Sequence, residues 1–168
     1  MSTSRIHRTT VAMFLACVLL GPQSARAQGD PVTAELDAFW AGVVTSVTEW
    51  SIPAQKATYH PDAVGVTGTR SSYKTYLLWS EFAAKEADPA EMSAPPKRRI
   101  LEFRFSSRVH DATTAHEVGL YHYCEEGQDH YYGTVDSYLV KRDGRWRILV
   151  EIQLELAMTE ADWNALRP

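Results

Sequence analysis

The chain has 168 residues, of which 45% are apolar, so it is long enough to bury the core of one domain. Its formal net charge is −4, and its one dense basic cluster, at 97–99, is too short to form the basic surface of a nucleic-acid-binding protein. We therefore expect a globular domain without a nucleic-acid partner.

The first 27 residues have the pattern of a secretory signal peptide. Basic residues within 5–8 precede an apolar run at 11–20, and an Ala-Arg-Ala cleavage pattern ends at Ala27. The apolar run is too short to span a bilayer, and no later segment has the pattern of a membrane span. We expect cleavage after Ala27, one domain at 28–168, and a periplasmic or secreted location.

Two helices are predicted at the start of this domain. Asp30 before Pro31 is a typical helix start, and apolar residues then recur at helical spacing up to Trp50. Ser51 is placed to cap a short second helix that ends near Tyr59, before a proline.

A short strand over 62–68 and a third helix over 73–87 are predicted next. Ser71 or Ser72 would cap this helix, and Asp88 before a proline would end it. The rest of the chain alternates long apolar-rich runs with short turns, which predicts strands over 98–109, 114–124, 129–142 and 145–155.

Near the C-terminus, Thr159 with Asp162 predicts the cap of a last short helix around Trp163. Helices followed by a run of antiparallel strands predict an α+β fold. The helices would pack on one face of a curved sheet, and the hairpin connections disfavour a parallel, doubly wound sheet.

Asp136 is unusual because it is a carboxylate in the middle of a predicted strand. Symmetric closure of the turn after Cys124 pairs Glu117 with Asp136 on one face of the sheet. Burial and the nearby Glu117 would then raise the pKa of Asp136.

The turn at 143–144 allows two registers for the last hairpin. A two-residue type I′ turn places Asp136 opposite Glu151 on a polar face, whereas a G1 bulge at Gly144 places it opposite Val150. We favour the bulge, because it gathers the apolar residues of the last strand on the face that the helices need. Asp136 would then lie on the helix-facing side.

Candidate site residues follow from this register. Asp136 and Glu117 are the candidate catalytic acids; the alternative for Asp136 is a structural carboxylate bound to a tyrosine or to an arginine such as Arg104. Aromatic residues would line a ligand pocket, although ordinary packing explains them as well. They are Trp40, Tyr59, Trp79, Tyr121, Tyr138 and Trp146.

No metal site or cofactor is predicted. His116 and His122 share a face of one strand but lie six residues apart, about 20 Å along a strand, which is too far to bind one ion together. Glycine-rich phosphate loops and nucleophile motifs are also absent from the sequence.

Three segments carry a resemblance to a known family. The aromatic helix at 35–50, the segment "ATYHPDAVGVTG" at 57–68 and the hairpin at 136–152 resemble the nuclear transport factor 2-like superfamily, and within it the SnoaL-like and ketosteroid-isomerase-like proteins. The resemblance implies a cone in which three helices cover a strongly curved sheet and enclose a pocket. It also implies a homodimer through the sheet.

The resemblance to ketosteroid isomerases does not extend to their catalytic set. Thr67 falls on the position of the catalytic base, and the first helix contains no tyrosine. Asp136 alone falls on a matching position, that of an oxyanion donor. We therefore do not expect ketosteroid isomerase activity.

Two functions remain open, together with a weaker third. The first is an exported SnoaL-like protein whose aromatic pocket binds a small hydrophobic molecule. The alternative is a cofactor-independent acid–base enzyme of the isomerase, cyclase or hydrolase type, which would use Asp136 with Glu117 or a tyrosine. The third is a scaffold whose function is dimerisation or partner binding.

Overall fold

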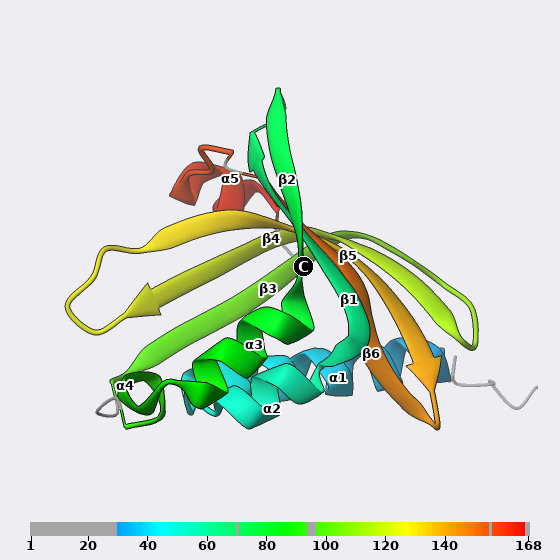
Figure 1. Ribbon diagram of the computed structural model, residues 1–168. Coiled ribbons are helices and arrows are strands. Elements are labelled where there is room, and N and C mark those ends of the chain that lie inside the picture. Colours follow the sequence, from blue (N-terminus) through cyan, green and yellow to red (C-terminus); the bar gives the residue numbers. More distant parts are fainter. Residues whose placement is uncertain (1–29, 70, 94–96, 155, 167–168) are drawn as a thin grey trace, which may run out of the picture.

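A strongly curved sheet covers a layer of helices in the computed structural model, which describes residues 30–69, 71–93, 97–154 and 156–166 (Figure 1). Helices α1 (Pro31–Thr48), α2 (Ile52–Ala57) and α3 (Leu78–Ala87) lie under the concave side of the sheet. The predicted α+β cone is therefore confirmed. The predicted signal peptide at 1–27 lies outside the described residues.

The start of α1 follows the prediction from its sequence. Oδ1 of Asp30 accepts a hydrogen bond from the backbone N–H of Val32 at 3.0 Å, and Pro31 occupies the first helical position. Leu36, Trp40 and Val43 form the buried stripe of this helix. The stripe fixes which face of α1 packs against the sheet.

The predicted helix over 73–87 is wrong in its first half. Residues Ser72–Leu77 form strand β2, which pairs antiparallel with β1 (Tyr59–Thr69), and the helix begins only at Leu78. Gly68 has a φ of +122° beside the turn, a conformation that favours glycine. Aromatic and β-branched residues here favour pairing with β1 over a helix.

The remaining strands agree with the prediction within two residues. They are β3 (Arg99–His110), β4 (Thr114–Glu125), β5 (Tyr131–Arg142) and β6 (Arg145–Leu154). In the described residues the sheet order is β2-β1-β6-β5-β4-β3, and every neighbouring pair is antiparallel except β1 with β6. Two short helices, α4 (Pro89–Met92) and α5 (Glu160–Ala165), complete the chain.

The predicted register of β4 with β5 is wrong by one residue. Glu117 pairs with Ser137 and Val118 pairs with Asp136, because the turn between the strands does not close symmetrically. A shift of one residue reverses the face of every side chain relative to its partner. Glu117 and Asp136 therefore lie on opposite faces of the sheet.

The predicted G1 bulge in the last hairpin is also wrong. Asp143 and Gly144 have φ values of 52° and 73°, as a two-residue type I′ turn requires, and Arg142 pairs with Arg145. A bulge occurs further along β6 instead, where Leu149 is the extra residue.

The bulge at Leu149 reverses the alternation of side chains along β6. Leu139 pairs with Ile148 before the bulge, and Ser137 pairs with Glu151 after it. Since Leu139 and Ser137 are both buried on the concave side, Glu151 also faces the helices. A residue that the strand pattern assigns to the polar face thus enters the interior.

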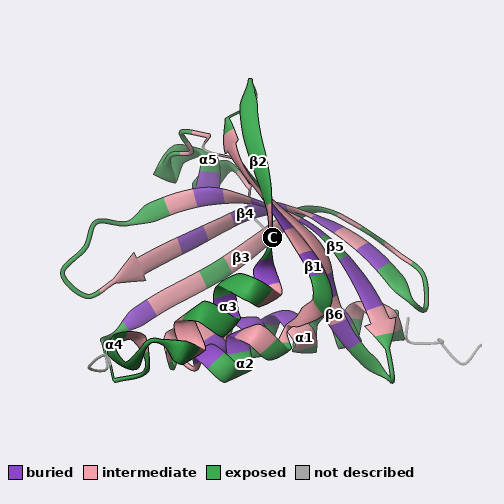
Figure 2. Cartoon of the chain, in the orientation of Figure 1, coloured by how far each residue is buried: buried purple, intermediate pink, exposed green. Residues whose placement is uncertain are grey.

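The core lies between α1 and the middle of the sheet, where Figure 2 shows buried residues on the facing elements. On the convex side, α5 packs against β4 through Trp163, whose ring lies 5.8 Å from that of His122. The predicted cap of this helix is confirmed, because Thr159 and Asp162 form a capping box. Among the described residues, no helix is both long and apolar enough to cross a bilayer.

Candidate functional site

A row of mostly polar residues crosses the concave face of the sheet. Each residue of the row is the cross-strand partner of the next residue on the neighbouring strand. From β2 to β3 the row is Tyr76, Gly65, Glu151, Ser137, Glu117 and Arg108. The hydroxyl of Ser137 is buried and has no hydrogen-bond partner among the described residues. Polar groups on a helix-covered face require hydrogen bonds or a cavity, so this row locates the candidate site.

An inner cavity of about 170 Å³ lies beside this row, between α1 and the sheet. Its walls are mostly apolar. Its polar groups are the hydrogen-bonded cluster of Tyr59, Glu151 and Gln153, together with the hydroxyl of Tyr121. The apolar walls are made by Val43, Val47, Leu101, Phe103, Tyr121 and Val135. This combination of apolar walls with a few convergent polar groups is typical of small-molecule sites.

Glu151 is the acid of the inner cavity. Its carboxylate accepts hydrogen bonds from the hydroxyl of Tyr59 at 2.8 Å and from the side-chain amide of Gln153 at 2.9 Å. Burial raises the pKa of Glu151 above its ordinary value of 4.5, and the two hydrogen bonds partly oppose that rise. Glu151 can therefore be a hydrogen-bond donor when protonated and a comparatively strong base when ionised.

Tyr59 stays protonated beside this carboxylate. Burial and the neighbouring negative charge of Glu151 raise the pKa of Tyr59 well above its ordinary value of 10.0. Its ring packs at 5.1 Å against Phe82 of α3, which fixes the direction of the hydroxyl. Because the Tyr59 proton is donated to Glu151, the pair presents acceptor oxygens to a donor group of a ligand when Glu151 is ionised.

Two glycines allow tyrosine rings to lie close against the sheet. The ring of Tyr121 occupies the space that a side chain at its cross-strand partner Gly133 would need, with ring atoms 2.6 Å from the position of a Cβ atom. Tyr76 covers Gly65 in the same way, with its Cζ atom at 2.4 Å. Both rings therefore extend along the concave face of the sheet.

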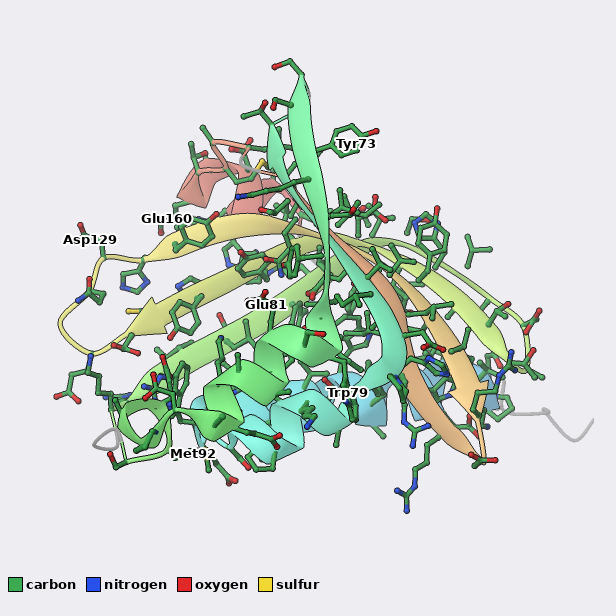
Figure 3. All side chains as sticks on the ribbon, viewed as in Figure 1. Tyr73, Trp79, Glu81, Met92, Asp129 and Glu160 are labelled. Carbon is green, nitrogen blue, oxygen red and sulfur yellow. The ribbon has the colours of Figure 1, made fainter. Side chains whose placement is uncertain are left out.

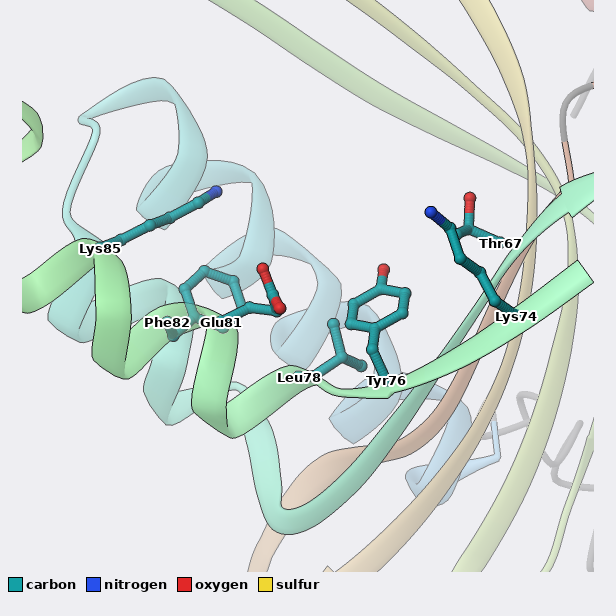
Figure 4. Close-up of a pocket in the computed structure, with 7 residues that line it drawn as sticks. All are labelled: Thr67, Lys74, Tyr76, Leu78, Glu81, Phe82 and Lys85. Atoms are coloured by element: carbon teal, nitrogen blue, oxygen red, sulfur yellow. The ribbon is translucent and has the colours of Figure 1, made fainter.

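An outer cavity of about 390 Å³ lies between α3 and the hairpin of β1 and β2 (Figure 4). Leu78 and Phe82 form its apolar side. The polar residues around it are Thr67, Lys74, Tyr76, Glu81 and Lys85. Thr67 is the residue at the position of the isomerase base. Its hydroxyl can form a hydrogen bond but cannot take a proton from a carbon atom at neutral pH.

The two cavities adjoin each other. Thr67 of the outer cavity pairs with Gln153 of the inner cavity, and the ring of Phe82 contacts that of Tyr59. Tyr76 and Glu151 both pair with Gly65, from opposite sides of β1. Burial, and then the charge of Glu151, raise the pKa of Tyr76. The residues between the two cavities, Thr67 with Gln153 and Phe82 with Tyr59, are therefore in direct contact.

Glu117 is buried but bound within the protein. Its carboxylate accepts a hydrogen bond from the indole N–H of Trp40 and pairs with Nε of Arg108 at 2.7 Å, and Arg108 also pairs with Asp37. Its side chain has no exposed surface and lines neither cavity. These contacts support a structural role for this predicted catalytic residue.

The predicted helix-facing position of Asp136 is wrong. Asp136 lies on the convex face, where Oδ1 is 2.9 Å from Nε2 of His116, and its side chain is 36% exposed. The ring of His116 stacks at 4.0 Å on Tyr138. Asp136 therefore has no access to the inner cavity, and Asp136 with Glu117 cannot form one acid pair.

Only some of the predicted ligand-lining aromatic residues reach the cavities. Tyr59 and Tyr121 line the inner cavity. Trp40 lies in the core, and Trp146 packs there with its N–H donated to Glu35.

The other two predicted ligand-lining residues, Tyr138 and Trp79, lie outside the cavities and the core. Tyr138 is 45% exposed on the convex face. Trp79 lies on α3 with the amine of Lys56 over its ring at 4.6 Å (Figure 3). Neither residue lines the inner or the outer cavity.

Glu151 and Gln153 were missed because strict alternation assigns both to the polar face. The signal for the bulge is the run Ile148-Leu149-Val150, in which three consecutive apolar residues break the alternation. Within the described ranges, no three side chains of histidine, cysteine, aspartate or glutamate gather in a way that could hold a metal ion.

No protein-family model matches the sequence, and no curated protein matches it either. Solved structures are similar in fold. A nuclear transport factor 2-like protein of unknown function from Shewanella oneidensis MR-1 has a TM-score of 0.57 and 18% identity, over 74% of this chain and 99% of that chain.

Two further solved structures are similar to this chain in fold. A nuclear transport factor 2-like protein with a cystatin-like fold from Novosphingobium aromaticivorans has a TM-score of 0.57 and 11% identity, over 81% of this chain and 89% of that chain. Another, of unknown function, from Pseudomonas putida KT2440 has a TM-score of 0.53 and 13% identity, over 80% and 94%. Fold alone is shown at such identities. The chain has the nuclear transport factor 2-like fold.

Proposed function

We propose that the protein binds a small, largely apolar molecule in the inner cavity. One polar group of this ligand would form hydrogen bonds with Glu151 and Tyr59. The observation that carries this proposal is a carboxyl group of raised pKa at the polar end of an apolar cavity. A volume of about 170 Å³ is close to that of cavities that hold one benzene ring. A phenol or an aromatic alcohol would place its ring against the apolar walls and its hydroxyl within hydrogen-bond distance of Glu151.

Binding of para-cresol, benzyl alcohol and toluene, followed by protein NMR, tests the proposal. We expect the two hydroxyl compounds to bind more tightly than toluene, because only they can form a hydrogen bond with Glu151. The shifted signals should come from residues around the cavity, such as Val43 and Val135.

Two variants sharpen this test. Val47→Phe should fill the cavity and weaken binding of all three compounds, whereas Asp136→Asn, on the other face of the sheet, should leave binding unchanged. Absence of binding to the wild-type protein would contradict the proposal. Equal binding by the Val47→Phe variant, shown to be folded by its melting curve, would contradict it as well.

An acid–base reaction is the second candidate, and the same carboxyl group favours it. In its ionised form Glu151 would take a proton from the carbon next to a carbonyl group. The Tyr59 hydroxyl would turn from Glu151 to donate its proton to the carbonyl oxygen. The proton returns to carbon in the reverse step, so deuterium from heavy water should enter acetophenone. Exchange no faster with the wild-type protein than with Glu151→Gln would exclude this reaction.

We also propose that the chain is exported and forms a homodimer through the convex face. Exposed apolar side chains on that face, Val109 and Tyr138, support the second part. Mass spectrometry of the periplasmic protein should give a chain that starts at Gln28. Light scattering should give a dimer that Tyr138→Lys converts to a monomer; a wild-type monomer would contradict the dimer.

A further inference from the structure

We infer that the outer cavity holds the carboxylate of an amphipathic organic acid whose apolar part extends into the inner cavity. This inference rests on the function proposed for the inner cavity and names the class of its ligand. The residues that carry it are Lys74 of β2 and Lys85 of α3, which reach towards the outer cavity from two sides (Figure 4).

The lysines of the chain fall into two groups. Lys56, Lys97 and Lys141 each form an ion pair with a glutamate. Lys74 and Lys85 have no carboxylate partner among the described residues, and both line the outer cavity. The amine of Lys85 lies 5.5 Å from the centre of the Phe82 ring, a contact that does not neutralise its charge. An amine without a carboxylate partner beside a cavity is available to an anion from outside.

Charge balance favours a single negative charge on the ligand. Glu81 also lines the outer cavity, so that the two amines and this carboxylate give a net charge of +1. A monocarboxylate neutralises that charge. A phosphate monoester carries about −1.5 to −2 at neutral pH and would add repulsion from Glu81, so the cavity fits a carboxylate better.

Neutral donors and an apolar side complete the outer cavity. The hydroxyl groups of Thr67 and Tyr76 lie among the lysines, and Tyr76 stays protonated because burial, Glu151 and Glu81 raise its pKa. Leu78 and Phe82 are buried and offer an apolar surface. Since Phe82 contacts Tyr59, that surface leads from the outer cavity towards the inner one.

Calorimetric titration with 4-phenylbutanoate and with 4-phenylbutan-1-ol tests the inference, because the two probes differ only in the charged end. We expect the acid to bind roughly tenfold more tightly than the alcohol at low salt, because one charge-assisted hydrogen bond contributes about that factor to the affinity. Added salt should reduce this preference, since the amines are partly exposed.

Lysine variants provide a matched comparison. Lys74→Gln and Lys85→Gln should each reduce the preference for the acid several-fold and leave binding of the alcohol unchanged. Lys97→Gln removes the same charge from a lysine already paired with Glu125, so it should leave the preference intact. Glu81→Gln should increase the preference, because it removes a repulsive charge.

The outcomes separate the two proposals. Binding of neither probe would contradict the function proposed for the inner cavity. Equal binding of acid and alcohol would contradict only the carboxylate site, as would an equal loss of preference in the Lys97→Gln and Lys74→Gln proteins. These exposed or half-buried positions allow each variant to be checked for an unchanged melting temperature first.

Discussion

The hydroxyl of Tyr59 donates a 2.8 Å hydrogen bond to the carboxylate of Glu151, across a separation of 92 residues in the chain. The contact joins the first residue of β1 to the strand beside it and places an acid at the polar end of the inner cavity. The bulge at Leu149 makes this contact possible, because without it Glu151 would face the convex side.

Replacing Glu151 by glutamine should change how stability depends on pH. The pKa of Glu151 is raised in the folded protein, so its contribution to stability is complete below its ordinary value of 4.5 and is lost as the pH rises through the folded value. Glutamine does not titrate. The free energy of unfolding of Glu151→Gln relative to wild type should therefore rise with pH above 4.5.

Each tenfold difference in proton affinity between the folded and unfolded states corresponds to about 1.4 kcal/mol of this change. Urea unfolding of both proteins across the acidic to neutral range measures it. A difference between the two proteins that falls with pH, or does not vary, would show that Glu151 is not held in its protonated form by burial.

Removing the Tyr59 hydroxyl should raise the pKa of Glu151 further. The hydrogen bond from Tyr59 stabilises the ionised carboxylate, and phenylalanine keeps the packing against Phe82 while losing that donor. Tyr59→Phe should also cost about 1 kcal/mol of stability. Carboxyl-selective NMR titration of the variant checks the direction; an unchanged or lowered pKa would contradict the proposed contact.

Glu117 and Asp136 should differ strongly when each is replaced by alanine. Loss of the Glu117 carboxylate leaves the buried indole N–H of Trp40 without an acceptor and leaves Arg108 paired only with Asp37, at a cost of about 3 kcal/mol. Asp136 is partly exposed and binds one histidine, so its loss should cost about 1 kcal/mol or less. Chemical denaturation measures both; equal effects would contradict the opposite faces of the two residues.

Two glycine-to-alanine substitutions should change stability in opposite directions. A Cβ atom at Gly119 would lie 2.0 Å from the backbone oxygen of Arg104, which cannot move easily, so Gly119→Ala should cost about 2–4 kcal/mol. Nothing lies within 4 Å of a Cβ atom at Gly42, which is exposed within α1. Gly42→Ala should therefore add about 0.5–1 kcal/mol, as measured by thermal or urea unfolding.

The sequence predicts most of the fold because local signals agree there. The caps at Asp30, Ser51 and Thr159 and the limits of the four long strands depend on a few neighbouring residues each. The α+β class follows from their order. Strand β2 was missed because the segment before Leu78 has a helical spacing of apolar residues, and pairing with β1 overrides it.

The site is harder to predict because it depends on register. Symmetric closure of the turn after β4 and a G1 bulge at Gly144 each displace a strand by one residue, and one residue decides which acid faces the cavity. The correct turn type alone would still have assigned Glu151 to the polar face. Only the bulge at Leu149, together with the pairing to Ser137, places it inside.

Titration of the Glu151 carboxyl carbon by NMR, with and without saturating para-cresol, tests the central claim most directly. In the free protein we expect a pKa above 4.5, because burial in the inner cavity disfavours the charged form. Para-cresol should change that pKa, because its hydroxyl would contact the carboxyl group and its ring would displace water from the cavity. A pKa at or below 4.5 that para-cresol leaves unchanged would contradict Glu151 as the acid of a ligand site.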